Sequence, residues 1–212
     1  MTVTLEHANS QQDSVTTTPD PVRGDLRAGR PVVVIDPETG RVVLALAGET
    51  ATTEAMAFVV RFGSGLVTAT VPVDRCRVLG LPPMLPVSAV TPGAPTDLAV
   101  SVDAIDGVGT GISARDRART MRALADESLG HGDFTRPGHV LVVGVGEDPA
   151  HSYGPARKLC ELSRSAGLSG IMAFADLVSR RDETTMAGVD EAHDFAAEFE
   201  LQLVWVQYLR AQ

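Results

Sequence analysis

The feature that most constrains this chain is a pair of apolar segments on either side of a short turn sequence. Residues 31–35 read Pro-Val-Val-Val-Ile, residues 36–40 read Asp-Pro-Glu-Thr-Gly, and residues 41–47 read Arg-Val-Val-Leu-Ala-Leu-Ala. Proline presets φ in a turn and glycine tolerates positive φ, while apolar runs rich in valine are typical of buried strands. We therefore predict a tight hairpin of two buried strands over residues 32–47.

Strand and helix patterns alternate along the rest of the chain. We expect strands at residues 65–73, 97–104, 139–144, 170–178 and 201–209, and helices at residues 53–61, 113–125, 155–167 and 190–200. Thr53 can cap the first of these helices, and Ser113 with Asp116 is close to a capping box. Alternating strands and helices with a hairpin predict an α+β, or mixed α/β, fold.

The N-terminal end of the chain differs in composition from the rest. Residues 1–21 are rich in Thr, Ser, Gln, Asp and Pro. Such a segment buries too little apolar surface to offset the entropy lost on ordering. We expect a disordered tail over residues 1–21 and a single domain over residues 22–212.

Charge and composition exclude several classes of function. The formal net charge is −9, which gives no electrostatic support to binding of nucleic acid or of an anionic membrane. No apolar run reaches the ~18 residues of a membrane span, and no secretory signal is recognisable. The two cysteines, Cys76 and Cys160, show no metal-ligand spacing, so buried free thiols are expected. We expect a cytoplasmic protein.

Short motifs relate the chain to a known family. Residues 61–65 read Arg-Phe-Gly-Ser-Gly, residues 79–84 read Leu-Gly-Leu-Pro-Pro-Met, residues 110–114 read Thr-Gly-Ile-Ser-Ala, and residues 136–139 read Arg-Pro-Gly-His. In this order they resemble 3,4-dihydroxy-2-butanone-4-phosphate synthase of riboflavin biosynthesis. The resemblance implies a three-layer α+β fold with a mixed sheet and a homodimer whose sites lie at the subunit interface.

The segments to which the resemblance assigns the chemistry are altered. The family has an acidic loop after its first strand, whose carboxylates hold Mg²⁺; here only Asp36 and Glu38 are acidic, and turn chemistry explains both. In the family's Arg-x-Gly-His-Thr-Glu-Ala motif, the metal-binding histidine is replaced by Pro155. A glutamate at the end of a later strand is replaced by Phe174.

These replacements change the function that we expect. The resemblance implies enolisation of ribulose 5-phosphate, rearrangement and release of formate with Mg²⁺. Because metal ligands, acid/base carboxylate and phosphate-binding groups are altered together, we predict no ordinary synthase activity, no metal and no cofactor. We favour a pocket repurposed for metal-independent chemistry on a different small molecule. The alternatives are a non-catalytic binding or regulatory subunit, and an unorthodox synthase that binds metal through Asp36 and Glu38.

The candidate site residues combine retained and new groups. The candidate catalytic residues are Asp36, Glu38, His139, His151 and Tyr153, and the candidate substrate-binding residues are Arg61, Ser64, Thr110, Arg117, Arg157 and Phe174. His139 also fits a hydrogen-bonded structural role, and His151 a solvated loop.

Three further features leave alternatives open. Arg117 equally fits an ion pair with Asp116 or another carboxylate. Arg157, in a helix's first turn, opposes the macrodipole unless it faces a carboxylate or a ligand. The Gly107–Gly111 loop ahead of a helix could cradle an anion with its N–H groups.

Overall fold

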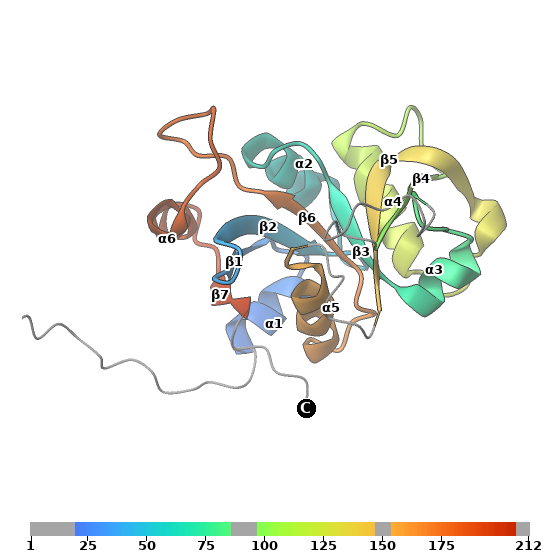
Figure 1. The fold of residues 1–212 in the computed structure, drawn as a ribbon, viewed down its shortest axis with the longest axis horizontal. Coiled ribbons are helices and arrows are strands. Elements are labelled where there is room, and N and C mark those ends of the chain that lie inside the picture. The colour runs from blue at the N-terminus through green and yellow to red at the C-terminus, as the bar shows by residue number, and fades with distance from the viewer. Residues whose placement is uncertain (1–19, 86–96, 147–153, 207–212) are drawn as a thin grey trace, which may run out of the picture.

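A seven-stranded mixed sheet with strand order β4-β5-β3-β6-β2-β1-β7 forms the centre of the computed structural model (Figure 1), which describes residues 20–85, 97–146 and 154–206. The strands are β1 (Val32–Asp36), β2 (Arg41–Ala47), β3 (Thr68–Pro72), β4 (Leu98–Ala104), β5 (Phe134–Val145), β6 (Met172–Asp176) and β7 (Leu203–Trp205). Strand pairs β1–β7 and β3–β5 are parallel, and the other neighbours are antiparallel.

Helices cover both faces of this sheet. They are α1 (Asp20–Arg27), α2 (Thr53–Phe62), α3 (Val73–Leu79), α4 (Ala114–Ala125), α5 (Ala156–Ser165) and α6 (Val189–Glu198). Alternate strand residues divide between two apolar clusters: Val33 and Leu44 pack with α2, α4 and α6, whereas Val32 and Val43 pack with α1 and α5. Figure 1 shows α1 and α5 together on one side of the sheet. The mixed α/β, three-layer prediction is confirmed.

The predicted hairpin is also present. Asp36 pairs with Arg41 at the end of the β1–β2 ladder, and Gly40 adopts the positive φ of 70° that the turn requires. The Asp36 carboxylate accepts hydrogen bonds from the Glu38 N–H (N to Oδ1, 3.1 Å) and the Thr39 hydroxyl (Oγ1 to Oδ2, 2.7 Å). This carboxylate therefore stabilises the turn.

The observed helix ends agree only in part with the ends predicted from the sequence. Ser113 caps α4 as predicted, since its Oγ accepts from the Asp116 N–H at 3.0 Å. The prediction that Thr53 caps α2 is wrong: Thr52 has extended backbone and its Oγ1 accepts from the Ala55 N–H at 3.1 Å. Pro155 is the cap of α5 and not its first helical residue.

Two helices were not expected. The short α3 directly follows β3 and begins at Val73, the last residue of the strand predicted over residues 65–73. Helix α1 begins at Asp20, two residues before the predicted start of the domain, and buries Val22 and Leu26 against the sheet. Residues 1–19 lie outside the described residues, so the tail and the single domain stay predictions. Within the described ranges, no helix is long and apolar enough to cross a membrane.

The cap assignment predicts a difference between two adjacent threonines. Thr52→Ala removes the side-chain acceptor of α2 and should lower the free energy of unfolding by about 1 kcal/mol. Thr53→Ala, in the first turn of the same helix, should change it by less than about 0.5 kcal/mol. Urea denaturation followed by circular dichroism measures both, and an equal loss in the two variants would contradict the assignment.

Candidate active site

A β-bulge shapes the retained Arg-Pro-Gly-His segment. Val102 of β4 pairs with Val140 of β5, but the next residue, Asp103, pairs with Thr135, so residues 136–139 loop out of the ladder. Such bulges re-aim side chains beside functional sites. A Cβ on Gly138 would collide with the backbone of Val102 and Asp103, so glycine is required for this close approach.

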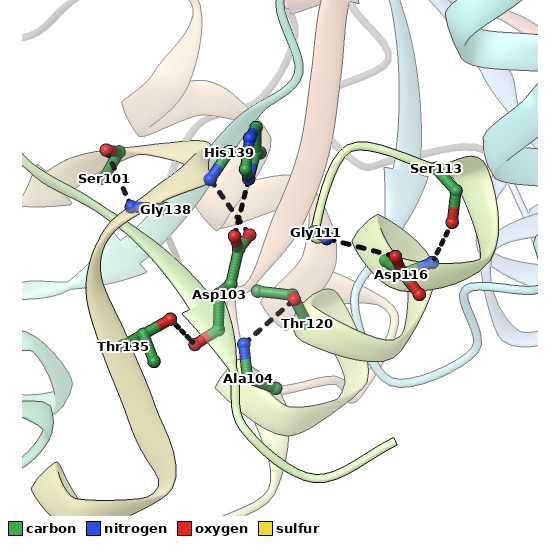
Figure 2. Close-up of polar contacts among 10 residues, drawn as sticks. All are labelled: Ser101, Asp103, Ala104, Gly111, Ser113, Asp116, Thr120, Thr135, Gly138 and His139. Atoms are coloured by element: carbon green, nitrogen blue, oxygen red, sulfur yellow. Dashed lines mark hydrogen bonds and ion pairs between the residues drawn. The ribbon is translucent and has the colours of Figure 1, made fainter. Parts of the chain in front are cut away.

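The bulge directs His139 onto a buried carboxylate (Figure 2). Asp103 accepts from the His139 N–H (N to Oδ1, 2.9 Å), and its Oδ2 lies 2.7 Å from His139 Nδ1. The Asp103 side chain is only 8% exposed, whereas that of His139 is 42% exposed. Because an ionised carboxylate only accepts hydrogen bonds, Nδ1 carries the proton and Nε2 of the neutral ring keeps its lone pair. This is the arrangement of an oriented general base.

The glycine-rich loop closes over this pair. Gly111 has a φ of 89°, and a Cβ there would collide with Asp103 Oδ2 and His139 Nδ1. Its N–H donates to Asp116 Oδ2 at 3.1 Å. Burial raises the pKa of Asp116, but the N–H groups of Gly111 and Gly109 and the Ser113 hydroxyl outweigh it, so the net pKa shift is downward. The loop N–H groups that could bind an external anion thus bind the Asp116 carboxylate, and this contact anchors the loop to α4.

Arg117 supports the same site from α4. Its residue is 5% exposed, and its Nη1 donates to the Gly65 carbonyl at 2.9 Å. Burial lowers the pKa of Arg117, while the nearby Asp103 charge acts in the opposite direction. Arg117 therefore joins α4 to the 61–65 motif, and the carboxylate whose charge acts on its pKa is Asp103 and not the neighbouring Asp116.

The other retained candidates are at the surface. Thr110 is exposed beside Gly111, and Arg61 is exposed with its guanidinium 5.2 Å from the centroid of the Phe62 ring. Ser64 is exposed, and its N–H donates to the Asp176 carbonyl at 2.8 Å. These positions keep all three side chains accessible to a ligand.

Among the described residues, the candidates in the altered segments lie apart from His139. Glu38 is exposed in the β1–β2 turn beside Asp36. Arg157 faces a carboxylate, since its Nε lies 3.1 Å from Glu161 Oε1, which relieves its unfavourable place in the first turn. Phe174 is 1% exposed within the core under α5, so we do not retain it as a substrate contact. His151 and Tyr153 lie outside the described residues.

Three site residues were missed by sequence reasoning. Asp103 lies in a predicted strand, and its contact with His139 depends on a bulge register that one sequence does not reveal. Arg41 and Asp176 form a bidentate pair across β2 and β6, with Nε to Oδ1 and Nη2 to Oδ2 both at 2.8 Å. The sequence feature that points to Asp176 is an acidic residue at the end of an otherwise apolar strand.

The described residues do not fit a divalent metal ion. No group of three or more His, Cys, Asp or Glu side chains within residues 20–85, 97–146 and 154–206 could hold one. Asp36 is engaged by its own turn, and Asp176 is engaged by Arg41. We therefore assign no chemical step to a metal.

A separate cleft of about 1110 Å³ lies between α3 and α5 beside the ends of β3 and β5. Its charged lining is largely paired, Asp74 with Arg77 and Arg157 with Glu161, so it concentrates charge of neither sign. Cys76 and Cys160 also line it, and both are free and buried. Burial raises the pKa of the Cys76 thiol to about 12, which makes it a poor nucleophile.

Comparison with known proteins identifies the family. The family profile described as 3,4-dihydroxy-2-butanone 4-phosphate synthase matches residues 20–212. The chain belongs to this family. Riboflavin biosynthesis protein RibBA of Rhodococcus erythropolis is 42% identical over 194 residues, which are 88% of this chain and 44% of that protein. The chain thus spans less than half the length of the curated relatives it matches.

Solved structures of synthases share the fold. The 3,4-dihydroxy-2-butanone 4-phosphate synthase of Candida albicans superposes with a TM-score of 0.78 at 29% identity, over 91% of this chain and 95% of that one. A second synthase structure, described as a complex with two magnesium ions, gives a TM-score of 0.75 at 30% identity, over 89% and 92% of the chains.

These relatives correct the expected function. The sequence favoured a repurposed pocket without synthase activity, because the three altered segments were taken to outweigh the retained motifs. Identity of 42% over most of the chain to proteins named for riboflavin biosynthesis contradicts that interpretation. The retained motifs include His139 and Gly111, which lie against Asp103.

The tautomer of His139 tests the geometry of this pair. In the wild-type protein the neutral ring should carry its proton on Nδ1, because that atom donates to Asp103. Asp103→Ala should move the neutral ring toward the Nε2-protonated form, which long-range ¹H–¹⁵N spectra of the imidazole resolve. The signals of His193, on α6, should not change; an unaltered His139 spectrum would contradict the assigned hydrogen bond.

The two buried thiols should resist alkylation. At pH 8, far below the pKa of about 12 for Cys76, almost no thiolate forms in the folded protein. Mass spectrometry after iodoacetamide treatment should find the native protein unmodified and the urea-unfolded protein carrying two adducts, one on each cysteine. Rapid native modification of Cys76 would show that the cleft exposes and activates it.

Proposed function

We propose that this chain is an active 3,4-dihydroxy-2-butanone 4-phosphate synthase of riboflavin biosynthesis. The observation that carries the proposal is the Asp103–His139 pair, a half-exposed histidine fixed by a buried carboxylate within a retained family motif. The 42% identity to a riboflavin biosynthesis protein over 88% of the chain supports it. The substrate that the resemblance implies is ribulose 5-phosphate, and the one-carbon product is formate.

The protein's own residues suit the proton transfers of this reaction. Enolisation needs a positioned group that removes a proton beside a carbonyl. His139 Nε2 is the exposed end of a ring whose Nδ1 is fixed by Asp103. Gly111 lies directly against that pair, so a larger residue there should act through the orientation of the His139 ring.

We further propose that the active unit is a homodimer with sites at the subunit interface. Strand β5, which carries His139, and β2, which follows the turn with the candidate residues Asp36 and Glu38, are separated by β3 and β6. At a strand spacing of about 4.8 Å they lie roughly 14 Å apart, too far for one small substrate within a single copy. Leu66, Ile105 and Ile112 are exposed apolar residues beside the Asp103–His139 pair, which suits a surface covered by a second copy.

The proposed setting of the enzyme is the cytoplasm. Two free cysteines and no disulfide within the described residues are typical of a reducing compartment. The proposed partners are a small-molecule substrate and a second copy of the chain. The net charge of −9 gives no support to a nucleic-acid partner.

Formate release from ribulose 5-phosphate tests the proposed function. The purified protein should release formate at an enzymatic rate, read by a coupled formate dehydrogenase assay. His139→Gln should reduce kcat by about 10²- to 10⁴-fold, the usual contribution of a general base. The matched variant His193→Gln should retain wild-type kcat. No formate from the folded wild-type protein would overturn the proposal, and full activity in His139→Gln would remove His139 from the chemistry.

A further inference from the structure

The loop that joins β4 to α4 passes directly over the Asp103–His139 pair. Gly111 is buried against Asp103 Oδ2 and His139 Nδ1, with no space for a Cβ between them. Thr110, the preceding residue, is exposed. The Thr110 hydroxyl is therefore open to solvent within one residue of the His139 ring, close enough to contact a small molecule that reaches that ring.

The Asp116 carboxylate holds the loop on both sides of Thr110. Its Oδ2 accepts a hydrogen bond from the Gly111 N–H at 3.1 Å (Figure 2), and the Gly109 N–H also donates to this carboxylate. Asp116 is itself fixed at the start of α4, where Ser113 Oγ accepts from its N–H at 3.0 Å. Both neighbours of Thr110 are thus bonded to one side chain of a helix.

Asp116 is suited to this role because it is buried and ionised. The residue is 7% exposed, and the N–H groups of Gly109 and Gly111 and the Ser113 hydroxyl lower its pKa despite that burial. Hydrogen bonds to an ionised acceptor are roughly twice as strong as those between neutral groups. An asparagine has one acceptor oxygen and places an NH₂ group where the second oxygen was, so it cannot replace the carboxylate.

The start of the loop is held by a weaker contact. Arg119 Nε donates to the Asp106 carbonyl at 3.2 Å, and its Nη2 donates to the Asp106 carboxylate at 2.6 Å. The Asp106 side chain is almost fully exposed, and exposed ion pairs contribute little to stability. The position of Thr110 therefore depends mainly on Asp116.

We propose that Asp116 is a positioning residue for substrate binding: through Gly109 and Gly111 it fixes Thr110, whose hydroxyl bonds to the substrate beside His139. A loop that is fixed before binding avoids the entropy cost of ordering it at that moment. The proposal rests on the proposed function for the identity of the substrate as ribulose 5-phosphate. Asp116 acts through Thr110 and does not itself contact the substrate.

A double-mutant cycle, read by calorimetric titration of ribulose 5-phosphate, tests this role. Thr110→Ala and Asp116→Asn should each weaken binding by about 10-fold, the effect of losing one hydrogen bond to a charged group. Because Asp116 acts through Thr110, adding Asp116→Asn to Thr110→Ala should weaken binding by less than about 2-fold more. A merely structural role would give the full loss in both backgrounds.

Asp126→Asn is the matched control. Asp126 lies at the other end of α4 and also accepts two hydrogen bonds from its own loop, from the N–H and the hydroxyl of Ser128. Its variant should bind ribulose 5-phosphate as the wild type does. Wild-type affinity in Asp116→Asn, or an equal loss with and without the Thr110 hydroxyl, would overturn the proposal.

Amide hydrogen exchange of the unmodified protein tests the same contacts without any variant. The N–H groups of Gly109 and Gly111 should exchange slowly in the free protein, because Asp116 binds both before the substrate arrives. Rapid exchange of both amides in the free protein would overturn the proposal. Neither measurement involves turnover, so failure to release formate would contradict the proposed function and leave this inference standing.

Discussion

The buried Asp103 carboxylate is the group on which the site depends. It accepts two hydrogen bonds from His139, it lies beneath Gly111, and its charge acts on Arg117. A carboxylate that is 8% exposed requires such partners, since an unpaired buried charge would cost several kcal/mol. The looped-out segment of β5 brings both the N–H and the ring of His139 to this carboxylate. The proposed general base is thus fixed by the same contacts that join β4 to β5.

The region around β2 and β6 keeps the architecture of the family, although its charged groups differ from the family pattern. There the Arg41–Asp176 pair joins β2 to β6, and the turn that follows β1 engages its own carboxylate, Asp36. The fold as a whole superposes on that of a solved synthase with a TM-score of 0.78.

Much of the fold was predictable because it depends on local patterns. The β1–β2 hairpin followed from Pro37 and Gly40 between valine-rich runs, and Ser113 marked the start of α4. The site was less predictable, because Asp103 meets His139 only through a bulge, and Arg41 meets Asp176 across strands distant in sequence. The functional interpretation was wrong because missing ligands were weighed residue by residue, whereas family membership rests on identity along the whole chain.

A crystal structure with bound ribulose 5-phosphate tests the central claim most directly, since it shows which side chains meet the substrate. The account predicts the sugar phosphate within hydrogen-bond reach of His139 Nε2, with Nδ1 still held by Asp103. A sugar phosphate remote from His139 would contradict it.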